Sequence, residues 1–203
     1  SQLKPSNYLI ADPVFWSDQS GNNKLEKKNI DLYKALNNAE WKINLYIPEN
    51  SLDYIKQKIR NTNFINIINF PVRSSYLSDI NHRANMISNY MVPPNICNAC
   101  LVAIWIAIMS NPQSIYLYGL DSDGFKNLET DQKTNEVKSG FNHFYDKKYI
   151  PDREGKSKFL YQRFQQIYVM YREFQVLSII CKKKKIPIKN LSSYSMLDTF
   201  ERG

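Results

Sequence analysis

The chain has 203 residues, of which 43% are hydrophobic and 23% charged, and its formal net charge is +8. That length and composition suffice for one domain with its own core, and no apolar run reaches the roughly 18 residues of a membrane-spanning helix. The positive charge favours an acidic partner, with nucleic acid, an anionic membrane surface and a phosphorylated substrate as alternatives.

The first part of the chain alternates short apolar strands with helices. The first strand runs into Ala11-Asp12-Pro13, and Pro13 keeps the preceding residue out of helical geometry. Ser51 is expected to cap the second helix. Strands are expected at residues 8–10, 43–47 and 64–70, and helices at 30–36 and 52–59.

The second part begins with a mixed segment, residues 73–94, which predicts a helix with irregular flanks or a small lid. A long apolar helix follows, with Asn95 or Asn98 as its N-cap. The apolar and aromatic run 115–118 is typical of a strand buried on both faces, with Tyr118 in the core. A polar loop, an amphipathic helix and a last strand are then expected at residues 122–142, 158–180 and 186–188.

This alternation predicts an α/β protein with a mostly parallel sheet flanked by helices, folded as a single domain over residues 1–203. In such sheets ligands bind beyond the carboxyl ends of the strands, where helix N-termini offer N–H groups to phosphate. The residues expected at that edge are Asp12, Pro13, Asn95, Asn98, Gly119, Asp121, Ser192 and Ser195.

Cys97, Cys100 and Cys181 are the three cysteines of the chain. The first two have CxxC spacing, but no second pair completes a zinc site, so we interpret them as small buried thiols. The absence of a secretory pattern agrees with a cytoplasmic location.

The lysine run 182–185 has two interpretations. It is either a solvated helix C-terminus whose cations complement the helix dipole, or a patch that docks on the inner face of the cytoplasmic membrane.

Three ordered segments carry a resemblance to a known family: 99–121, which ends in Gly119-Leu120-Asp121, then His143-Phe144-Tyr145, and 190–195. They resemble the small bacterial CMP-sialic-acid-dependent sialyltransferases and their relatives in capsule and lipopolysaccharide synthesis, over residues 95–200. The resemblance implies a Rossmann-like nucleotide-binding domain with a small lid. It also implies inverting transfer of a sugar to a surface glycan, with sialic acid or a related acidic sugar as the candidate, and with no cofactor required.

For His143 the resemblance implies the general base that deprotonates the acceptor hydroxyl, while Asp121 shapes the site. An unperturbed histidine has a pKa of about 6.5, and positioned proton transfer contributes roughly 10²–10⁴ in rate. Tyr145 and Tyr149 are candidates to hydrogen-bond the departing nucleotide phosphate in place of a metal. The alternative is that His143 is a surface-loop histidine with no such task.

Two further groups of charged residues remain open to alternatives. Asp121 and Asp123 have the Asp-x-Asp spacing that holds Mg²⁺ or Mn²⁺ in other transferases, although Asp-Ser-Asp-Gly is also ordinary turn composition. Arg73, Arg83 and Arg153 are candidate clamps for an acidic sugar or phosphate, or else solvated surface arginines.

The sequence departs from the family at its start. The related enzymes open with a strand and a Gly-x-Gly-Pro-Ser loop that contacts the nucleotide, and no such segment precedes Tyr8 here. We therefore expect a domain without that element, whether lost or lying outside this chain.

Other functions stay open beside the transferase. One is a metal- and ATP-dependent pyrophosphokinase of the pterin type, which shares the Gly-x-Asp strand end. Another is a non-catalytic nucleotide- or nucleic-acid-binding domain, which the lack of stacking residues among the lysines disfavours. For the transferase we expect a nucleotide sugar, a glycan or lipid-linked acceptor and peripheral membrane contact as partners, no nucleic acid, and an open oligomeric state in which a homo-oligomer is an alternative.

Overall fold

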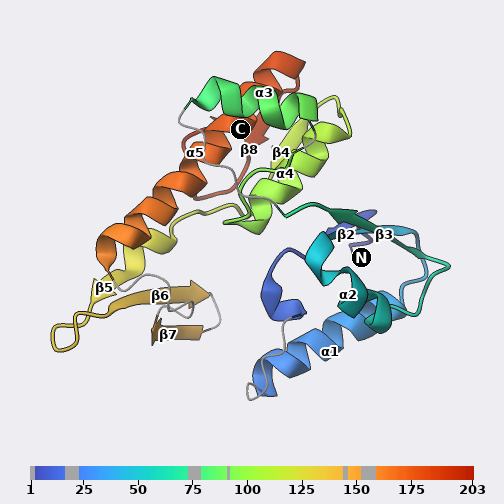
Figure 1. Cartoon of the computed structure of the whole chain (residues 1–203), viewed down its shortest axis with the longest axis horizontal. Coiled ribbons are helices and arrows are strands. Elements are labelled where there is room, and N and C mark those ends of the chain that lie inside the picture. The colour runs from blue at the N-terminus through green and yellow to red at the C-terminus, as the bar shows by residue number, and fades with distance from the viewer. Residues whose placement is uncertain (1–2, 17–22, 73–78, 91, 144–145, 152–158) are drawn as a thin grey trace. The chain divides into compact units, whose positions relative to one another are not determined.

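The computed structural model describes residues 3–16, 23–72, 79–90, 92–143, 146–151 and 159–203 (Figure 1). Strands and helices alternate along the chain, as the sequence predicts, and the protein is α/β with two small parallel sheets flanked by helices. A third, antiparallel sheet is added to this framework. No helix in the described ranges is long and apolar enough to cross a membrane.

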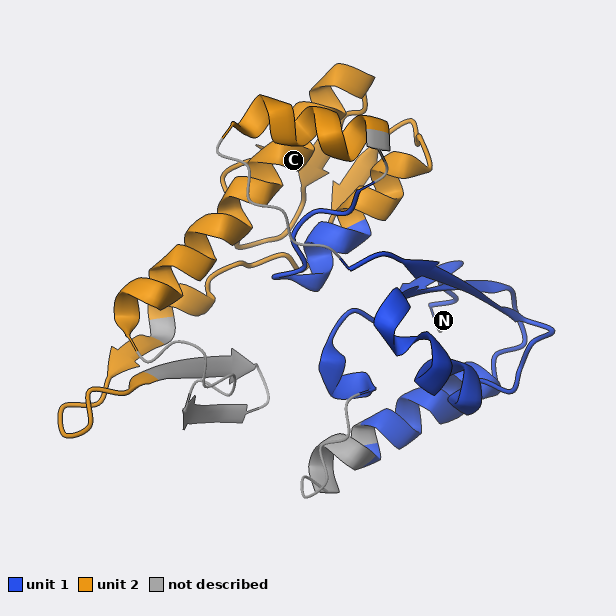
Figure 2. Cartoon of the chain, viewed as in Figure 1, with its two compact units in different colours: residues 1–75, 91–103 blue, residues 76–90, 104–203 orange. Residues whose placement is uncertain are grey.

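Contacts between residues divide the chain into two compact units (Figure 2). Unit 1 comprises residues 1–75 and 91–103, and unit 2 comprises residues 76–90 and 104–203. Each unit has its own parallel sheet, so each is described by itself.

Unit 1 is a three-stranded parallel sheet in the order β1-β2-β3 with two α-helices and short 3-10 turns. In β2, side chains alternate between buried and half-buried positions, as the sequence predicts. Its inward side chains pack against Tyr33 and Leu36 of the first helix and Ile55 of the second. The elements are β1 (Asn7–Leu9), η1 (Pro13–Phe15), α1 (Asn23–Asn37), β2 (Ile43–Pro48), η2 (Glu49–Ser51), α2 (Leu52–Lys58) and β3 (Ile65–Phe70).

The outward side chains of this sheet form a ladder of asparagine amides. Asn44 Nδ2 donates to Asn7 Oδ1 at 3.1 Å, and Asn66 Nδ2 donates to Asn44 Oδ1 at 3.0 Å. Since side chains alternate across a strand, the polar ladder and the apolar core occupy opposite faces.

Ser51 stands at the N-cap position of α2, as predicted, but it does not cap the helix with its side chain. Its hydroxyl donates instead to Pro48 O at 2.7 Å, one turn earlier in the chain.

Unit 2 is built on a second parallel sheet in the order β4-β8-β9. The segment expected to hold a helix or a lid contains α3, which packs on α5 and buries Ala84 and Ile87. Residues 73–78 and 91 of that segment lie outside the described residues. The elements are α3 (Ile80–Tyr90), β4 (Ile115–Leu117), α5 (Leu160–Lys184), β8 (Ile188–Asn190) and β9 (Glu201–Arg202), with α4 (Ala99–Met109) continuing from unit 1 into unit 2.

A buried ion pair joins α3 to α5. Arg83 Nε lies 3.2 Å from Glu173 Oε1 and Arg83 Nη2 lies 3.3 Å from Oε2, and both side chains are fully buried. Two parallel hydrogen bonds of this kind satisfy both charges inside the core and fix how the two helices pack.

The expected polar loop after β4 is instead largely strand. It contains η3 (Gly124–Asn127) and the antiparallel strands β5 (Leu128–Thr130), β6 (Val137–His143) and β7 (Asp146–Pro151), in the order β5-β6-β7. The prediction was wrong because these strands are rich in lysine, asparagine and threonine and lack the apolar alternation that signals a half-buried strand.

The strand β4 is not buried on both faces. Ile115 is buried, but Tyr116 is 56% exposed and Tyr118, predicted to lie in the core, is 74% exposed. The apolar run was therefore misleading, because a tyrosine presents an apolar ring and a polar hydroxyl and is stable at a partly wet surface.

The lysine run ends α5, as the helix C-terminus interpretation expects. Its first three lysines occupy the last turn, and Lys185 follows in the left-handed conformation with φ of 57°. Lys183 Nζ donates to Asn85 Oδ1 at 2.7 Å, which ties the end of α5 to α3.

We expect Arg83→Met to lower the free energy of unfolding of unit 2 by about 3–5 kcal/mol, because the buried carboxylate of Glu173 would lose the guanidinium that neutralises it. The double variant Arg83→Met/Glu173→Leu should recover most of that loss. Hydrogen exchange at the amides of α3 and α5 measures the effect locally. Lys184→Met, an exposed cation of the same helix, is the control, and an equal loss in the control would contradict the assignment.

Candidate functional site

The candidate site of unit 2 lies where the carboxyl ends of β4 and β8 meet. The two strands pair in parallel, with Leu117 opposite Asn190, and Leu191 N donates to Leu117 O at 2.8 Å just beyond the pairing. The loops that follow the two strands therefore start side by side. This is the edge at which α/β proteins bind ligands and at which the sequence places Gly119, Asp121 and Ser192.

Asn190 organises the loop after β8. It is 1% exposed, its Oδ1 accepts from Ser192 N at 3.0 Å, and its Nδ2 donates to Ser195 Oγ at 3.1 Å. Ser195 Oγ in turn accepts from Leu197 N at 3.1 Å. The loop is therefore shaped by side chains that mimic backbone turns, and Ser195 is part of that framework.

Ser192 joins this loop to the one after β4. Its hydroxyl oxygen accepts from Leu120 N at 2.9 Å, a bond between residues 72 positions apart. A second link runs from Met196 N to Asp121 O at 2.7 Å. The two predicted segments are thus in direct contact, and Ser192 is placed by its partner rather than free to move.

The loop after β4 has an uncommon backbone. Gly119 has φ of +67° and Ser122 has φ of 52°, both in the left-handed region that non-glycine residues seldom adopt. An added Cβ on Gly119 would meet no atom within 4 Å, so glycine is favoured here by conformation alone. Strain at Ser122 is of the kind that concentrates at binding sites.

Ser122 is anchored by a residue that the sequence analysis did not select. The Tyr171 hydroxyl, on α5, donates to Ser122 O at 2.8 Å. The Ser122 Oγ atom is itself buried and has no hydrogen-bond partner within the described part of the chain. Burial raises the pKa of Tyr171, and the carboxylates of Asp198 and Asp123 raise it further, so this hydroxyl stays a donor at neutral pH.

The two acids of the loop differ in exposure, because Asp121 is exposed and Asp123 is half-buried. Two carboxylates at that spacing could contribute oxygen ligands to Mg²⁺. Nowhere in the described ranges do three or more His, Cys, Asp or Glu side chains gather as they would around a metal ion.

His143 is brought toward this loop by the backbone of the antiparallel sheet. It is the last residue of β6, which runs antiparallel to β5 and lies against η3. Since η3 directly precedes β5 and directly follows Asp123, β6 approaches the end of the β4 loop as it reaches His143. Tyr149 lies on β7 opposite Gly140, and Tyr145 lies outside the described residues.

The other predicted site residues belong to unit 1. Asp12 follows β1 and its Oδ1 accepts from Val14 N at 2.9 Å, which caps η1 with Pro13 in its first turn. Asn98 Oδ1 accepts from Cys100 N at 2.7 Å and so caps α4, as predicted. Asn95 precedes it and is buried. The structure thus collects Gly119, Asp121, Ser192 and Ser195 in unit 2, and Asp12, Pro13, Asn95 and Asn98 in unit 1.

Of the three arginines predicted to clamp an acidic group, the structure describes only Arg83. Arg83 is fully buried against Glu173, so its guanidinium is engaged inside the fold and a role as a surface clamp does not fit it. Arg73 and Arg153 lie outside the described residues.

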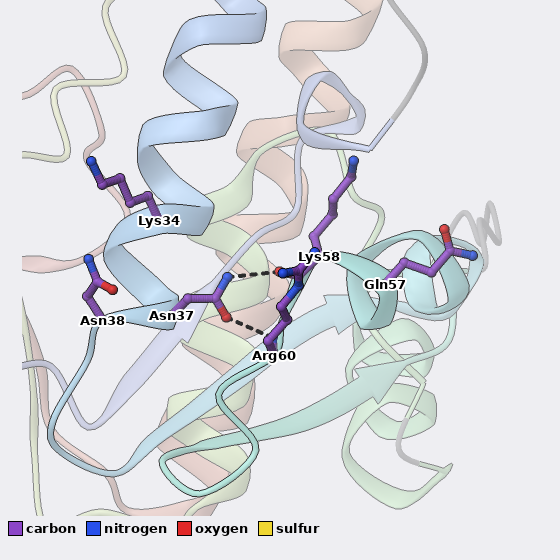
Figure 3. Close-up of a pocket in the computed structure, with 6 residues that line it drawn as sticks. All are labelled: Lys34, Asn37, Asn38, Gln57, Lys58 and Arg60. Carbon is purple, nitrogen blue, oxygen red and sulfur yellow. Dashed lines mark hydrogen bonds between the residues drawn. The ribbon is translucent and has the colours of Figure 1, made fainter.

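Unit 1 carries a cationic cleft away from Asp12. It has a volume of about 420 Å³ and is lined by Lys34, Asn37, Asn38, Gln57, Lys58 and Arg60 (Figure 3). Asn37 holds it together, because its Nδ2 donates to Lys58 O at 2.9 Å and its Oδ1 accepts from Arg60 N at 2.7 Å. The cleft lies where α1 and α2 end and β2 and β3 are about to begin, so it is at the amino edge of the sheet.

Sequence reasoning missed Tyr171, and it placed the segment 190–195 at this edge without assigning a role to Asn190 itself. An asparagine followed two residues later by serine, directly after a strand, is a turn signal that could have identified Asn190. No comparable signal exists for Tyr171, because it occupies a regular apolar position of a long helix.

Comparison with known proteins gives no family: no family model, no curated protein and no solved structure matches the chain. The class of protein is therefore given by the structure alone, as an α/β protein whose parallel strands β4 and β8 end in two interlocked loops.

The cysteines differ from the expected pair of buried helical thiols. Cys97 is exposed and precedes α4, Cys100 is half-buried, and Cys181 is buried. Burial raises the pKa of Cys181 to about 11 and also raises that of Cys100.

We expect Ellman's reagent at pH 8 to label Cys97 at least tenfold faster than Cys181, because the thiolate is the reactive form and Cys181 is both protonated and inaccessible. Urea should abolish the difference. Mass spectrometry of the labelled peptides identifies each site, and rapid labelling of Cys181 in the folded protein would contradict its burial.

We expect Asn190→Ala to lower the free energy of unfolding by about 2 kcal/mol, because the N–H of Ser192 and the hydroxyl of Ser195 lose their partner. Urea titration measures the loss, and hydrogen exchange at Leu120 and Ser192 should accelerate. Ser193→Ala changes an exposed neighbour and should alter stability by less than about 0.5 kcal/mol. Equal effects of the two substitutions would count against the role given to Asn190.

Proposed function

We propose that the chain is an inverting glycosyltransferase that moves a sugar from a CMP-activated donor to a surface-glycan acceptor, with His143 as general base. One observation supports this proposal: β6, which ends at His143, contacts η3, the turn that follows the loop after β4. A histidine beside the ligand edge of a parallel sheet is the arrangement that the resemblance to sialyltransferases implies.

In the proposed reaction the imidazole of His143 accepts the proton of the acceptor hydroxyl. The acceptor oxygen then bonds to the anomeric carbon of the donor sugar, while the bond from that carbon to the nucleotide phosphate oxygen breaks. The nucleotide leaves with the electron pair, and attack from the opposite face inverts the anomeric centre. Tyr145 and Tyr149 are assigned to hydrogen-bond the leaving phosphate, which stabilises charge without a metal.

The remaining residues are assigned to binding. Gly119 and Asp121 are assigned to shape the loop after β4 around the donor. Ser192 and Ser195 hold the loop after β8 through their hydrogen bonds with Leu120 and Asn190. Asp12, Pro13, Asn95 and Asn98 lie in unit 1 and stay predictions as nucleotide-binding residues, as Arg73 and Arg153 do as clamps for acidic groups.

The acceptor and the location are part of the same proposal. A glycan or lipid-linked acceptor would place the enzyme in the cytoplasm, in peripheral contact with the inner membrane face. The exposed side chains of Lys182, Lys184 and Lys185 support such contact, since cations near an anionic surface each contribute about 1 kcal/mol.

A pterin-type pyrophosphokinase is the second candidate, favoured by the carboxylates of Asp121 and Asp123 in the β4 loop. Such an enzyme would need a divalent metal and ATP. Calorimetric titration with CMP, and separately with ATP and Mg²⁺, distinguishes the two. Binding of ATP only when Mg²⁺ is present, with no binding of CMP, would replace the transferase proposal by the kinase.

We expect His143→Ala to lower the rate of sugar transfer from CMP-sialic acid by roughly 10²–10⁴, with CMP affinity changed less than threefold, because the base acts on the acceptor proton. His82→Ala is the matched control, since His82 is the only other histidine and lies on α3. Radiolabelled transfer to a lipooligosaccharide acceptor measures the rate. Near-full turnover of the His143 variant would remove this residue from the mechanism.

A further inference from the structure

An apolar groove adjoins the candidate site in unit 2. It has a volume of about 330 Å³, near the lower end of the range for small-molecule sites, so it fits a group of about one or two sugar rings. Three segments line it: η3, the first half of α5 and the loop after β8. The lining residues are Phe125, Phe164, Ile167, Tyr171, Met196 and Asp198.

The groove presents aromatic and apolar surface to solvent. Phe164 is 52% exposed and Met196 is 36% exposed, although side chains of this type are usually buried. Phe125 meets Tyr171 edge to face, with ring centroids 6.4 Å apart, so the end of the groove nearest the β4 loop is held rigid by ring packing. Rigid aromatic walls suit the flat C–H faces of a sugar.

The charges of the groove select among ligands. Asp198 lines it, and Asp198 and Asp123 both lie close enough to the Tyr171 hydroxyl to raise its pKa. Lys126, next to Phe125, hydrogen-bonds the Tyr194 hydroxyl and so is directed to another partner. Two carboxylates repel a phosphate or an acidic sugar, whereas they accept hydrogen bonds from the hydroxyls of a neutral one.

The groove is connected directly to the site loop. Tyr171 lines the groove and its hydroxyl donates to Ser122 O at 2.8 Å, while Met196 lines the groove and its N–H donates to Asp121 O at 2.7 Å. A ligand in the groove would therefore contact residues that hydrogen-bond directly to the loop at which the donor is proposed to bind.

We propose that this groove binds a neutral sugar of the acceptor glycan, next to the sugar whose hydroxyl is deprotonated. The assignment rests on the proposed transferase function and adds the class of acceptor. The acidic donor sugar would bind at the β4 loop, and a neutral sugar of the acceptor would bind in the groove. Phe164 supplies the stacking surface and Asp198 the hydroxyl acceptor.

Saturation-transfer NMR on the full chain, with lactose and N-acetylglucosamine as neutral probes, tests the groove without any nucleotide. We expect magnetisation transfer to the sugar C–H protons of at least one probe, a loss of at least fivefold in that signal for Phe164→Ala, and a smaller loss for Asp198→Asn. Tyr161→Ala is the matched control, because Tyr161 is a 66% exposed aromatic on the same helix that does not line the groove.

Three results would overturn the assignment: no transfer to either sugar, equal losses in the Phe164 and Tyr161 variants, or displacement of the sugar by CMP. Since Phe164 is exposed, its removal should leave the circular dichroism spectrum and melting temperature nearly unchanged. A titration with CMP separates this test from the parent proposal. If the protein binds a sugar but not CMP, the groove remains a sugar site and the transferase proposal is rejected. If it binds CMP and the Phe164→Ala variant keeps the full sugar signal, only the assignment of the groove is rejected.

Discussion

The parallel pairing of β4 with β8 is the constraint on which the candidate site depends. These strands are far apart in sequence, and the long helix α5 carries the chain back so that the second strand can lie beside the first. Only then can the hydroxyl of Ser192 reach the N–H of Leu120 and close the two loops on each other. The buried Arg83–Glu173 pair fixes α3 on α5, and Tyr171 of α5 holds Ser122, so helix packing and loop shape are linked.

Elements with a strong local signal could be predicted from the sequence. The alternation in β2 and the helical spacing in the second half of α5 reflect which face each element buries, and Asn98 caps α4 because an N-cap is decided by a few neighbouring residues. The placement of Gly119 and Ser192 at the same edge also followed, since the carboxyl ends of parallel strands share an edge.

Features that depend on distant partners could not be predicted. Arg83 is of a type usually found at the surface, whereas here it is buried against Glu173, 90 positions later, which neutralises its charge. The strands β5 to β7 carry polar side chains without a period, and Tyr116 and Tyr118 have the apolar rings of core residues on an exposed face. In each case burial is set by tertiary neighbours, which a local pattern does not contain.

The excess positive charge of the chain has a structural explanation that does not involve the site. Lys182 to Lys184 end α5, and the cations of the unit 1 cleft stand where α1 and α2 end (Figure 3). Cations at helix C-termini are stabilised by the helix dipole. By contrast, the groove beside the β4 loop is lined by Asp198, whose carboxylate, with that of Asp123, raises the pKa of Tyr171. A net charge of +8 therefore gives no measure of the field at the site, which depends on the local charges.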